Sequence, residues 1–291
     1  MRDTEKMRGS HFDLGLVRSP EGYSATLIIS VYKNLKNLEC ILGALSKQTI
    51  KCFEIIISED GDSIEMKEFL KPFLHLNTSL KHLSQEDNGF RKNRALNTAI
   101  RNASAQTLIF IDGDCVPHRR FIESHLRESE ENIICSGRRL ELGPALTRWA
   151  VRSSLVIRLL SNRLTFFFLL PLIVLDRGKN PESGVYSTVL QRTQKNKNAS
   201  IVGCNFSCSK SALIHINGFD ESYRAPGIGE DSDIEWRLKQ AGYSVRSIKF
   251  LAILFHLYHQ RTYQLSDENR QRYNLLLQSK QVRCLNGLSE R

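Results

Sequence analysis

The sequence predicts an α/β fold in which a mostly parallel central sheet carries helices on both faces. Apolar, β-branched runs alternate four times with segments whose apolar residues recur at helical spacing, within about ninety residues. Three of these runs end in polar segments of distinctive composition, SVYKN, SEDGD and IDGDC. Ligands of such sheets bind beyond the carboxyl ends of the strands, so we expect these three segments to line one cleft.

The first half of the chain supplies the regular elements. The run TLIISVY is typical of a strand buried on both faces, and the leucines that follow it recur at helical spacing. The same alternation continues as far as TLIFID. In chain order, the expected strands lie at 26–32, 53–58, 80–85 and 107–112, and the expected helices at 35–45, 66–74 and 95–100.

Residues 145–178 contain two predicted helical stretches and the apolar run LTFFFLLPLIVL at 164–175. A membrane-spanning helix needs about 20 apolar residues, so this run is too short to cross a bilayer. Two interpretations stay open: a buried helix pair, or a basic, apolar element that lies in the membrane interface. The second rests on the arginines that punctuate the segment, which are Arg148, Arg152, Arg158 and Arg163.

The second half is less regular. Residues 200–208 have the composition of a strand, and a short helix should follow, with Ser209 as its N-cap and Gly218 as its terminator. A loop rich in glycine then leads to a helix marked by Ile234, Leu238 and Ala241. That loop delivers three acidic residues to the N-terminus of the helix: Glu230, Asp231 and Asp233.

Net charge and cysteine content limit the partners and the cellular compartment expected for this chain. The net charge of +10 and the pI of about 9.3 favour an acidic partner, such as a nucleic acid, an anionic membrane face or a phosphorylated small molecule. The basic residues form short clusters without a long lysine tract, so nucleic acid is not the expected partner. Seven irregularly spaced cysteines and an N-terminus without an apolar signal core predict buried thiols in a cytoplasmic protein.

Seven segments of the chain form an ordered set of motifs: LIISVYKNLKNLECILGALSKQT, FEIIISEDGDS, QEDNGFRKNRALNTAI, FIDGDCVPHRRFI, GCNFSCSKSALIHINGFDE, GEDSDIEWRL and FHLYH. Together they resemble the motifs of the inverting family-2 glycosyltransferases of GT-A fold. The closest likeness is to members with a galactosyltransferase-like C-terminal motif, common among bacterial polysaccharide and lipopolysaccharide enzymes. The resemblance covers about residues 25–260 and implies a Rossmann-like, mostly parallel sheet that binds a nucleotide-diphospho-sugar.

With this resemblance, we expect a single catalytic domain at 24–262. It would comprise a nucleotide-binding half at 24–140, a helical insert at 141–199 that faces a membrane if the second interpretation holds, and an acceptor and catalytic half at 200–262. A loose arm at 1–23 would precede the domain, and a tail at 263–291 would follow it.

The pair Asp112 and Asp114 matches the family's Asp-x-Asp motif at a strand end. The resemblance implies that Asp112 hydrogen-bonds the ribose and that Asp114 binds a divalent cation. Two carboxylates this close repel each other unless a cation or donors compensate them, and a cation held against a pyrophosphate removes that repulsion. Gly113 leaves room for close approach.

The uridine end of the donor is assigned by the same resemblance. It implies that Tyr32 stacks on or near the base and that Asp60 hydrogen-bonds the uracil imide. The family's usual pair is Asp-Asp-Gly, whereas this chain has Glu59 before Asp60, so a role for Glu59 does not carry over.

A basic segment should contact the diphosphate. Asp87, Arg91 and Arg94 lie on a loop that enters a helix, where cations and free amides suit phosphate groups. The alternative is a solvated helix face.

The catalytic acid is implied to lie in GIGEDSD. The resemblance makes Asp231 the general base that takes the proton of the acceptor hydroxyl, and Glu230 a residue that orients hydroxyl groups. An aspartate with an ordinary pKa of about 3.9 is ionised at neutral pH and needs only the correct position. Asp233 fits a first-turn residue favoured by the helix dipole. The alternative is that all three acids only cap the helix.

Two histidines in FHLYH compete for the last ligand position of the metal. The family's ligand precedes an apolar-aromatic pair, which favours His256 over His259. A carboxylate and an imidazole suit Mn²⁺, with Mg²⁺ as the other candidate.

These assignments predict a metal-dependent enzyme that moves a hexose or N-acetylhexosamine from a UDP-sugar to a hydroxyl of a glycan or lipid-linked acceptor. A setting in surface polysaccharide or lipopolysaccharide synthesis, at the inner face of the cytoplasmic membrane, would suit the basic charge. The alternative is a non-catalytic nucleotide-sugar or nucleic-acid binding protein. A nucleotidyltransferase is disfavoured because SVYKNLKN lacks a glycine-rich phosphate loop.

Overall fold

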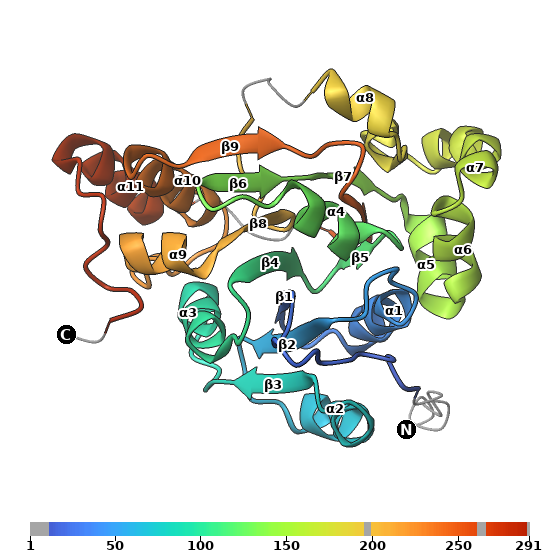
Figure 1. Ribbon diagram of the computed structural model, residues 1–291, viewed down its shortest axis with the longest axis horizontal. Helices are drawn as coiled ribbons and strands as arrows, with labels where there is room; N and C mark the ends of the chain where they lie inside the picture. Colours follow the sequence, from blue (N-terminus) through green and yellow to red (C-terminus); the bar gives the residue numbers. More distant parts are fainter. Residues whose placement is uncertain (1–11, 195–198, 261–265, 290–291) are drawn as a thin grey trace.

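The computed structural model describes residues 12–194, 199–260 and 266–289, and its main feature is a seven-stranded sheet (Figure 1). The strand order is β3-β2-β1-β4-β8-β6-β9. The strands are β1 (Ala25–Val31), β2 (Phe53–Glu59), β3 (Leu80–Ser84), β4 (Thr107–Asp112), β6 (Ile133–Ser136), β8 (Phe206–Ser209) and β9 (Ser244–Ser247).

All strands of this sheet run parallel except β8. It pairs antiparallel with both β4 and β6, with Phe206 opposite Phe110. The first four strands are the four predicted ones. In the register of the sheet, Ser30 lies beside both Ser58 and Asp112, so the ends of β1, β2 and β4 meet at one edge. This is the edge at which the polar segments were expected to converge.

Helices cover both faces of the sheet because the side chains of its strands alternate between two cores. On β1, Leu27 and Ile29 point into one hydrophobic cluster and Ile28 into the other. The first cluster packs against α1 (Leu35–Leu45), α2 (Ile64–Leu76), α4 (Phe121–Glu128), α5 (Pro144–Arg152), α6 (Ser154–Leu160) and α7 (Arg163–Leu175). The second packs against α3 (Lys92–Asn102), α9 (Lys210–Ile216) and α10 (Glu230–Gln240).

A second, three-stranded sheet lies beside the end of β4. It consists of β5 (Cys115–Pro117), β10 (Ile253–His256) and β7 (Arg138–Glu141), with β10 in the middle. His256 pairs with Cys115 across β5 and β10. Because Cys115 directly follows Asp114, this pairing brings His256 next to the Asp-x-Asp motif.

The remaining elements surround the two sheets. A short 3-10 helix, Pro181–Gly184, and α8 (Thr188–Arg192) follow α7, and α11 (Asp267–Ser279) precedes the C-terminal segment. Segment 145–178 forms three helices instead of the two predicted, because Ser153 and Asn162 each cap a new helix with their side chains.

Two predictions about secondary structure in the second half need correction. The strand expected at 200–208 begins only at Phe206, and the residues before it form a turn in which the Asn205 N–H donates to the Val202 carbonyl. The helix marked by Ile234 begins at Glu230, so Glu230 and Asp231 occupy its first turn.

The two ends of the described chain pack on the domain. Residues 1–11 of the predicted arm lie outside the described residues, but for 12–23 the prediction of a loose arm is wrong. Leu14 is fully buried, and its N–H donates to Asn77 Oδ1. In the expected tail, the Cys284 N–H donates to the Ile216 carbonyl and the Leu288 N–H to the Asn217 carbonyl.

No helix that the structure describes is by itself both long and apolar enough to cross a bilayer. Helices α6 and α7 meet that criterion only when they are joined, and they are bent by 107° at their break.

Candidate active site

A cavity of about 550 Å³ opens at the edge where β1, β2 and β4 end. The first residues of α3 close one of its sides. Among its lining residues are Tyr32, Ser58, Asp60, Lys92, Asp112, Asp114 and His259. Gly113 fits here because a Cβ at that position would lie 2.9 Å from the Ser30 carbonyl oxygen, so the chain after β4 passes directly against β1.

Asp60 is held rigidly at one end of this cavity. Its Oδ1 accepts a hydrogen bond from Gln85 Nε2 at 2.7 Å, and its Oδ2 accepts one from the Arg91 N–H at 2.8 Å. The side chain is 8% exposed and lines the cavity. Each carboxylate oxygen has two lone pairs, so both retain capacity for a ligand donor.

Tyr32 lies beside Asp60 with its ring exposed to 53%. The phenol donates to Asp87 Oδ2 at 3.3 Å, and Lys33 contacts both partners, with Nζ 4.6 Å from the centre of the ring and 2.6 Å from Asp87. Asp87 thus positions Tyr32 and Lys33, and it is absent from the lining of the cavity.

The structure gives Glu59 a structural role. Its Oε2 pairs with His82 Nε2 at 2.9 Å, and its Oε1 accepts from the Ser63 N–H at the start of α2. The side chain is 1% exposed. Glu59, which stands where the family usually has the first aspartate of Asp-Asp-Gly, therefore joins β2 to β3. Asp60 is left as the acid that faces the cavity.

Asp114 and two histidines form a cluster, of which Asp114 and His259 line the cavity. Asp114 Oδ2 lies 3.5 Å from His256 Nε2 and 3.2 Å from His259 Nε2. One ligand atom from each residue lies within 4.8 Å of the others. Burial would raise the pKa of Asp114, but the hydrogen bond of His259 and the charge of His256 outweigh it and lower the pKa to about 2. Both competing histidines therefore face Asp114.

Lys92 joins the Asp-x-Asp motif to the acids of α10. Its Nζ lies 2.8 Å from Asp112 Oδ1 and also pairs with Glu230 Oε1. The two carboxylates raise the pKa of Lys92 well above its usual value, against the effect of burial. Lys92 thus stays charged and compensates a group of acids that would otherwise repel one another.

Asp231 is positioned by a backbone amide and a glycine. Its Oδ2 accepts a hydrogen bond from the Gly203 N–H at 2.9 Å. A Cβ on residue 203 would lie 1.9 Å from Asp231 Oδ1, so only glycine fits beside this carboxylate. Asp231 also interacts electrostatically with Lys92, Asp112 and Arg139.

Both acids at the start of α10 titrate above their usual range. Burial raises the pKa of Glu230 to about 7, with repulsion from Asp231 and Asp112 adding to it and Lys92 opposing it. Burial also raises the pKa of Asp231, against the charge of Lys92 and the hydrogen bond from Gly203. The ordinary pKa expected for Asp231 is therefore wrong.

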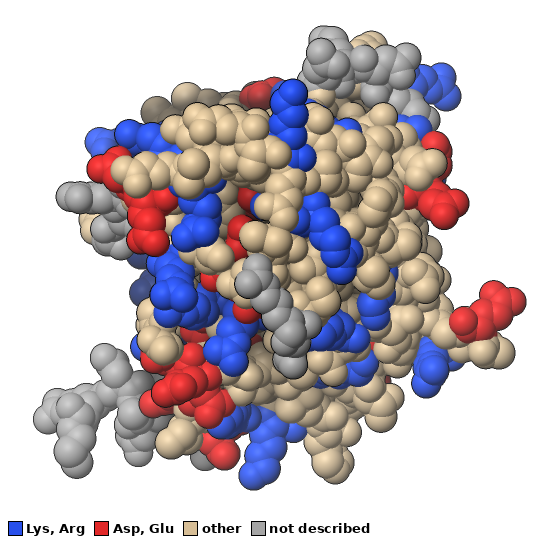
Figure 2. Space-filling view, turned by 90° about the vertical axis from the view of Figure 1, so that its left-hand side faces the viewer, with Lys and Arg blue, Asp and Glu red and all other residues tan. Residues whose placement is uncertain are grey.

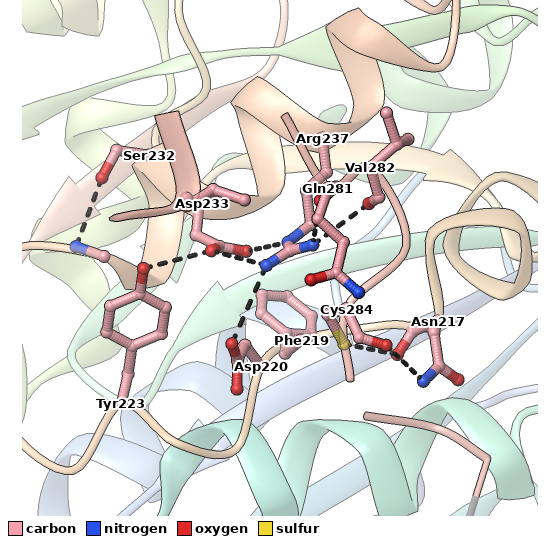
Figure 3. Close-up of polar contacts among 12 residues, drawn as sticks. Asn217, Phe219, Asp220, Tyr223, Ser232, Asp233, Arg237, Gln281, Val282 and Cys284 are labelled. Atoms are coloured by element: carbon pink, nitrogen blue, oxygen red, sulfur yellow. Dashed lines mark hydrogen bonds and ion pairs between the residues drawn. The ribbon is translucent and has the colours of Figure 1, made fainter. Parts of the chain in front are cut away.

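Helix α10 is fixed in place by its buried Arg237 (Figure 3). Arg237 Nε donates to Asp233 Oδ1 at 2.6 Å, and Nη1 donates to the Gln281 carbonyl at 2.7 Å. Asp233 also accepts from the Tyr223 hydroxyl at 3.1 Å. These contacts tie the acidic end of α10 to the loop before it and to the C-terminal segment. Asp233 lies in the first turn of α10, where the helix dipole was expected to favour an acid, and it is also the centre of this network.

Besides Asp87, two more of the predicted binding residues stay outside the lining of the cavity. Arg91 is the N-cap of α3 and contacts the site through its backbone N–H, while Arg94 is exposed. Lys92, the residue after Arg91, contacts the acids instead. Sequence reasoning also missed Ser58 and Gly203. Ser58 is 2% exposed, lines the cavity, and its hydroxyl has no hydrogen-bond partner among the described residues.

Comparison with known proteins identifies the family. The model of glycosyl transferase family 2 matches residues 26–216. The chain belongs to glycosyl transferase family 2. A second family model, described as the N-terminal domain of galactosyltransferase, matches residues 185–260. The predicted resemblance is thereby confirmed, and the chain is classed among glycosyltransferase enzymes.

Relatives of this family-2 chain are similar over limited lengths. Chondroitin synthase from Escherichia coli is 23% identical over 238 residues, which are 77% of this chain and 33% of that protein. Glycosyltransferase AglE from Haloferax volcanii is 32% identical over 100 residues, which are 34% of this chain and 33% of that protein. The chain thus spans about a third of the length of these curated relatives.

Solved structures confirm the GT-A fold of this family-2 chain. A mannosyltransferase from Pyrobaculum calidifontis, in complex with GDP-mannose and Mn²⁺, has a TM-score of 0.53 at 15% identity, over 85% of this chain and 61% of its own. GalNAc-T7, with UDP, GalNAc and Mn²⁺, has a TM-score of 0.60 at 15% identity, over 87% of this chain and 47% of its own.

Proposed function

We propose that this chain transfers a hexose or N-acetylhexosamine from a UDP-sugar to a hydroxyl of a glycan acceptor, with inversion at the anomeric carbon. The observation that carries the proposal is the convergence of three groups of residues on one cavity. Tyr32 and Asp60 line the cavity, as do Asp114 and His259 of the cluster with His256. Lys92 connects Asp112 to the acids of α10. The relatives and solved structures named above support the same reaction class.

The base end of the donor would bind between Tyr32 and Asp60. The exposed ring of Tyr32 offers a stacking surface, and Asp60 has unused acceptor capacity for the imide N–H of uracil. Ser58 adds a buried hydroxyl that lacks a protein partner, next to Asp60 along the chain. Replacement of Ser58 by alanine should raise the KM for the donor while leaving kcat unchanged, if the hydroxyl binds ground state and transition state equally.

A divalent cation fits the cluster of Asp114, His256 and His259. One carboxylate and two imidazoles form a donor set that suits Mn²⁺, and their ligand atoms are close enough to share one ion. When bound, the cation supplies positive charge for the leaving diphosphate. Mg²⁺ prefers oxygen ligands, so two imidazoles favour Mn²⁺ over it.

Asp231 would act as the general base toward the acceptor hydroxyl. The Gly203 amide holds one of its oxygens, which fixes the direction of the other. Glu230 would orient hydroxyl groups, and Lys92 would keep Asp112 and Glu230 compensated as the negative diphosphate enters. Inversion follows from a single in-line displacement, in which the carboxylate accepts a proton and forms no covalent bond to the sugar.

The acceptor is proposed to be a glycan or lipid-linked glycan of surface polysaccharide or lipopolysaccharide synthesis, handled at the cytoplasmic side of the membrane. Similarity to a polysaccharide synthase over 77% of the chain supports a glycan acceptor.

Nucleic acid remains a disfavoured partner by prediction. On the face drawn in Figure 2, Lys and Arg side chains lie among Asp and Glu without forming one continuous stripe.

A screen of UDP-sugars for donor hydrolysis tests the function without knowledge of the acceptor. We expect slow UDP release from at least one UDP-hexose or UDP-N-acetylhexosamine, dependent on Mn²⁺ and abolished by Asp114→Ala. The anomeric configuration of the product, read by NMR, should be inverted. Absence of binding to every UDP-sugar by the folded wild-type protein, measured by calorimetry with Mn²⁺ present, would contradict the proposal.

A further inference from the structure

Helix α7 is apolar around its whole circumference but packs against the protein along one side only. Phe166 and Ile173 are buried in the first hydrophobic cluster, and Phe166 packs so closely on Gly184 that a Cβ there would lie 2.5 Å from its ring. The outer side carries six exposed large side chains, which we call the α7 patch. They are Leu164, Phe167, Phe168, Leu172, Val174 and Leu175.

The members of the α7 patch form one surface. Their spacing of three, four and seven residues places them on the same side of a helix. Phe168 and Leu175 are the most exposed, at 85% and 81%. Helices α5, α6 and α7 stack at one side of the molecule with α8 nearby (Figure 1), and Leu155 on α6 is also exposed. Exposed apolar surface that is concentrated in this way marks an interaction site.

The α7 patch lies in a segment rich in exposed basic side chains, with Arg163 at the start of α7 and Arg177 just after its end. Residues 145–194 contain seven basic and two acidic residues. None of the seven has an ion pair among the described residues, whereas both acids are engaged: Asp176 accepts from the amides that start α5, and Glu182 pairs with Lys249. The basic residues are Arg148, Arg152, Arg158, Arg163, Arg177, Lys179 and Arg192. The patch is thus an apolar helix face with free positive charge around it.

We propose that the α7 patch binds the surface of a bilayer that contains anionic lipid, with α7 lying in the membrane interface. An apolar helix face flanked by arginines is the combination that inserts among acyl chains while its cations contact anionic headgroups. With 13 residues α7 is about 20 Å long, too short to cross the hydrocarbon core.

Two other occupants fit the surface less well. Spanning by α6 and α7 together would pull Val156 and Leu160 out of the hydrophobic cluster in which they are buried. Pairing with a second copy of the chain through a twofold axis would bring two sets of unpaired arginines face to face. An anionic bilayer supplies the opposite charge.

Helix α5 connects the region of the α7 patch to the candidate active site. Helix α5 begins three residues after Glu141, which pairs with His256 on the small sheet. Thr147 on α5 accepts a hydrogen bond at 2.8 Å from the N–H of Tyr258, which lies between the two histidines of the metal cluster. Binding at the α7 patch would therefore hold the cavity at a fixed distance from the bilayer surface.

Vesicle flotation of the purified full chain tests this inference. The vesicles contain either phosphatidylcholine alone or equal parts of phosphatidylcholine and phosphatidylglycerol. We expect the wild type to float with the anionic vesicles, and the double substitution Phe168→Ser and Leu175→Ser to weaken its partitioning about tenfold or more. Removal of Arg163 and Arg177 by substitution with glutamine should weaken binding to the anionic vesicles about fivefold for each arginine.

Matched controls separate membrane binding from damage to the fold. Ile64→Ser with Ile214→Ser replaces two exposed apolar residues elsewhere, and this variant should float like the wild type. Thermal unfolding should show that all variants fold. UDP-sugar hydrolysis in solution should be unchanged by the α7 substitutions, so the outcome is independent of the proposed function.

Three results would overturn the inference. In the first, the wild type fails to float with anionic vesicles, and in the second, the α7 double variant floats as well as the wild type. In the third, sedimentation velocity would show a wild-type dimer that the α7 substitutions dissociate, with no vesicle binding, which would assign the patch to a second copy.

Discussion

At the level of single residues, the contact between Gly203 and Asp231 is the tightest constraint on the candidate base. Substitution Gly203→Ala would put a methyl group where Asp231 Oδ1 lies, so the carboxylate must move. Displacement of a catalytic group by about 1 Å can cost about 100-fold in rate, and we expect a loss of kcat of that order. In Gly43→Ala, the added methyl would meet nothing closer than the Phe12 ring at 3.9 Å. That control should keep full activity in the same UDP-release assay.

The role of Asp231 itself is tested by Asp231→Asn. Loss of a general base lowers kcat by about 10²- to 10⁴-fold, while affinity for UDP, measured by calorimetry, should change little. The control Asp267→Asn removes an exposed acid in the first turn of α11. Full turnover by Asp231→Asn would remove the assignment.

The pKa shift of Asp231 predicts the pH dependence of the reaction. The base works only when it is ionised, so activity should rise with pH through its raised pKa. The charged groups that act on it are Lys92, Asp112, Glu230 and Arg139. Because Lys92 lowers the pKa of Asp231, Lys92→Met should move the acid limb of the kcat/KM profile to higher pH. A limb that stays in place, or moves to lower pH, would rule out this coupling.

At the level of elements, α10 depends on the buried pair of Arg237 and Asp233. Substitution Arg237→Leu leaves Asp233 buried without its cation and breaks the bonds to the C-terminal segment. Breaking a buried pair from one side costs about 3–5 kcal/mol, so we expect the free energy of unfolding in urea to fall by that amount.

A matched control lies on the neighbouring helix. Arg272 and Glu268 of α11 form a pair with a separation of 3.9 Å, and their side chains are 38% and 72% exposed. Because exposed pairs contribute less than about 1 kcal/mol, Arg272→Leu should change stability little. Equal losses for the two arginines would show that burial of Arg237 is not the cause.

The regular elements were predictable because their signals are local. Long apolar runs identified β1, β2 and β4, whose side chains alternate between two buried clusters, while β3 was expected from its place after a helical segment. The strands of the small sheet have only three or four residues and depend on pairing between remote segments, so no periodicity reveals them. The three acids were expected at the N-terminus of α10, and the structure places them in its first turn, a position that suits acids near the helix dipole.

Site residues were predictable where the family motif names them and less so where geometry decides. The motif identified Asp60, Asp114 and Asp231 as acids of one site, and the structure brings all three to the same edge of the sheet. The basic segment at 91–94 was recognised, but which cation faces inward depends on the phase of α3. Because Arg91 is the N-cap of that helix, Lys92 is the cation whose side chain contacts Asp112.

At the level of the whole molecule, the cluster of Asp114, His256 and His259 connects the two sheets. Asp114 follows β4 of the large sheet, and His256 ends β10 of the small one. A cation held by both should therefore resist separation of the sheets. At a free concentration of 100 times its Kd, a ligand stabilises the folded state by about 2.7 kcal/mol. We expect Mn²⁺ to raise the Tm of the wild type and to have no effect on Asp114→Ala.

Substitution His215→Ala removes an exposed histidine far from the cluster in sequence, and this variant should respond to Mn²⁺ like the wild type. A Tm increase that persists in Asp114→Ala would place the ion elsewhere.

The reversed direction of β8 has a consequence for which sequence changes the chain tolerates. Because this strand runs antiparallel to β4, it starts at the edge of the sheet where β1, β2 and β4 end. The short turn before Phe206 carries Gly203, whose N–H donates to Asp231. The number of residues between Gly203 and Phe206, which pairs with Phe110 of β4, therefore fixes the direction of that amide. One residue inserted there would turn the amide away, whereas lengthening the opposite end of the strand, beyond Ser209, would leave the carboxylate undisturbed.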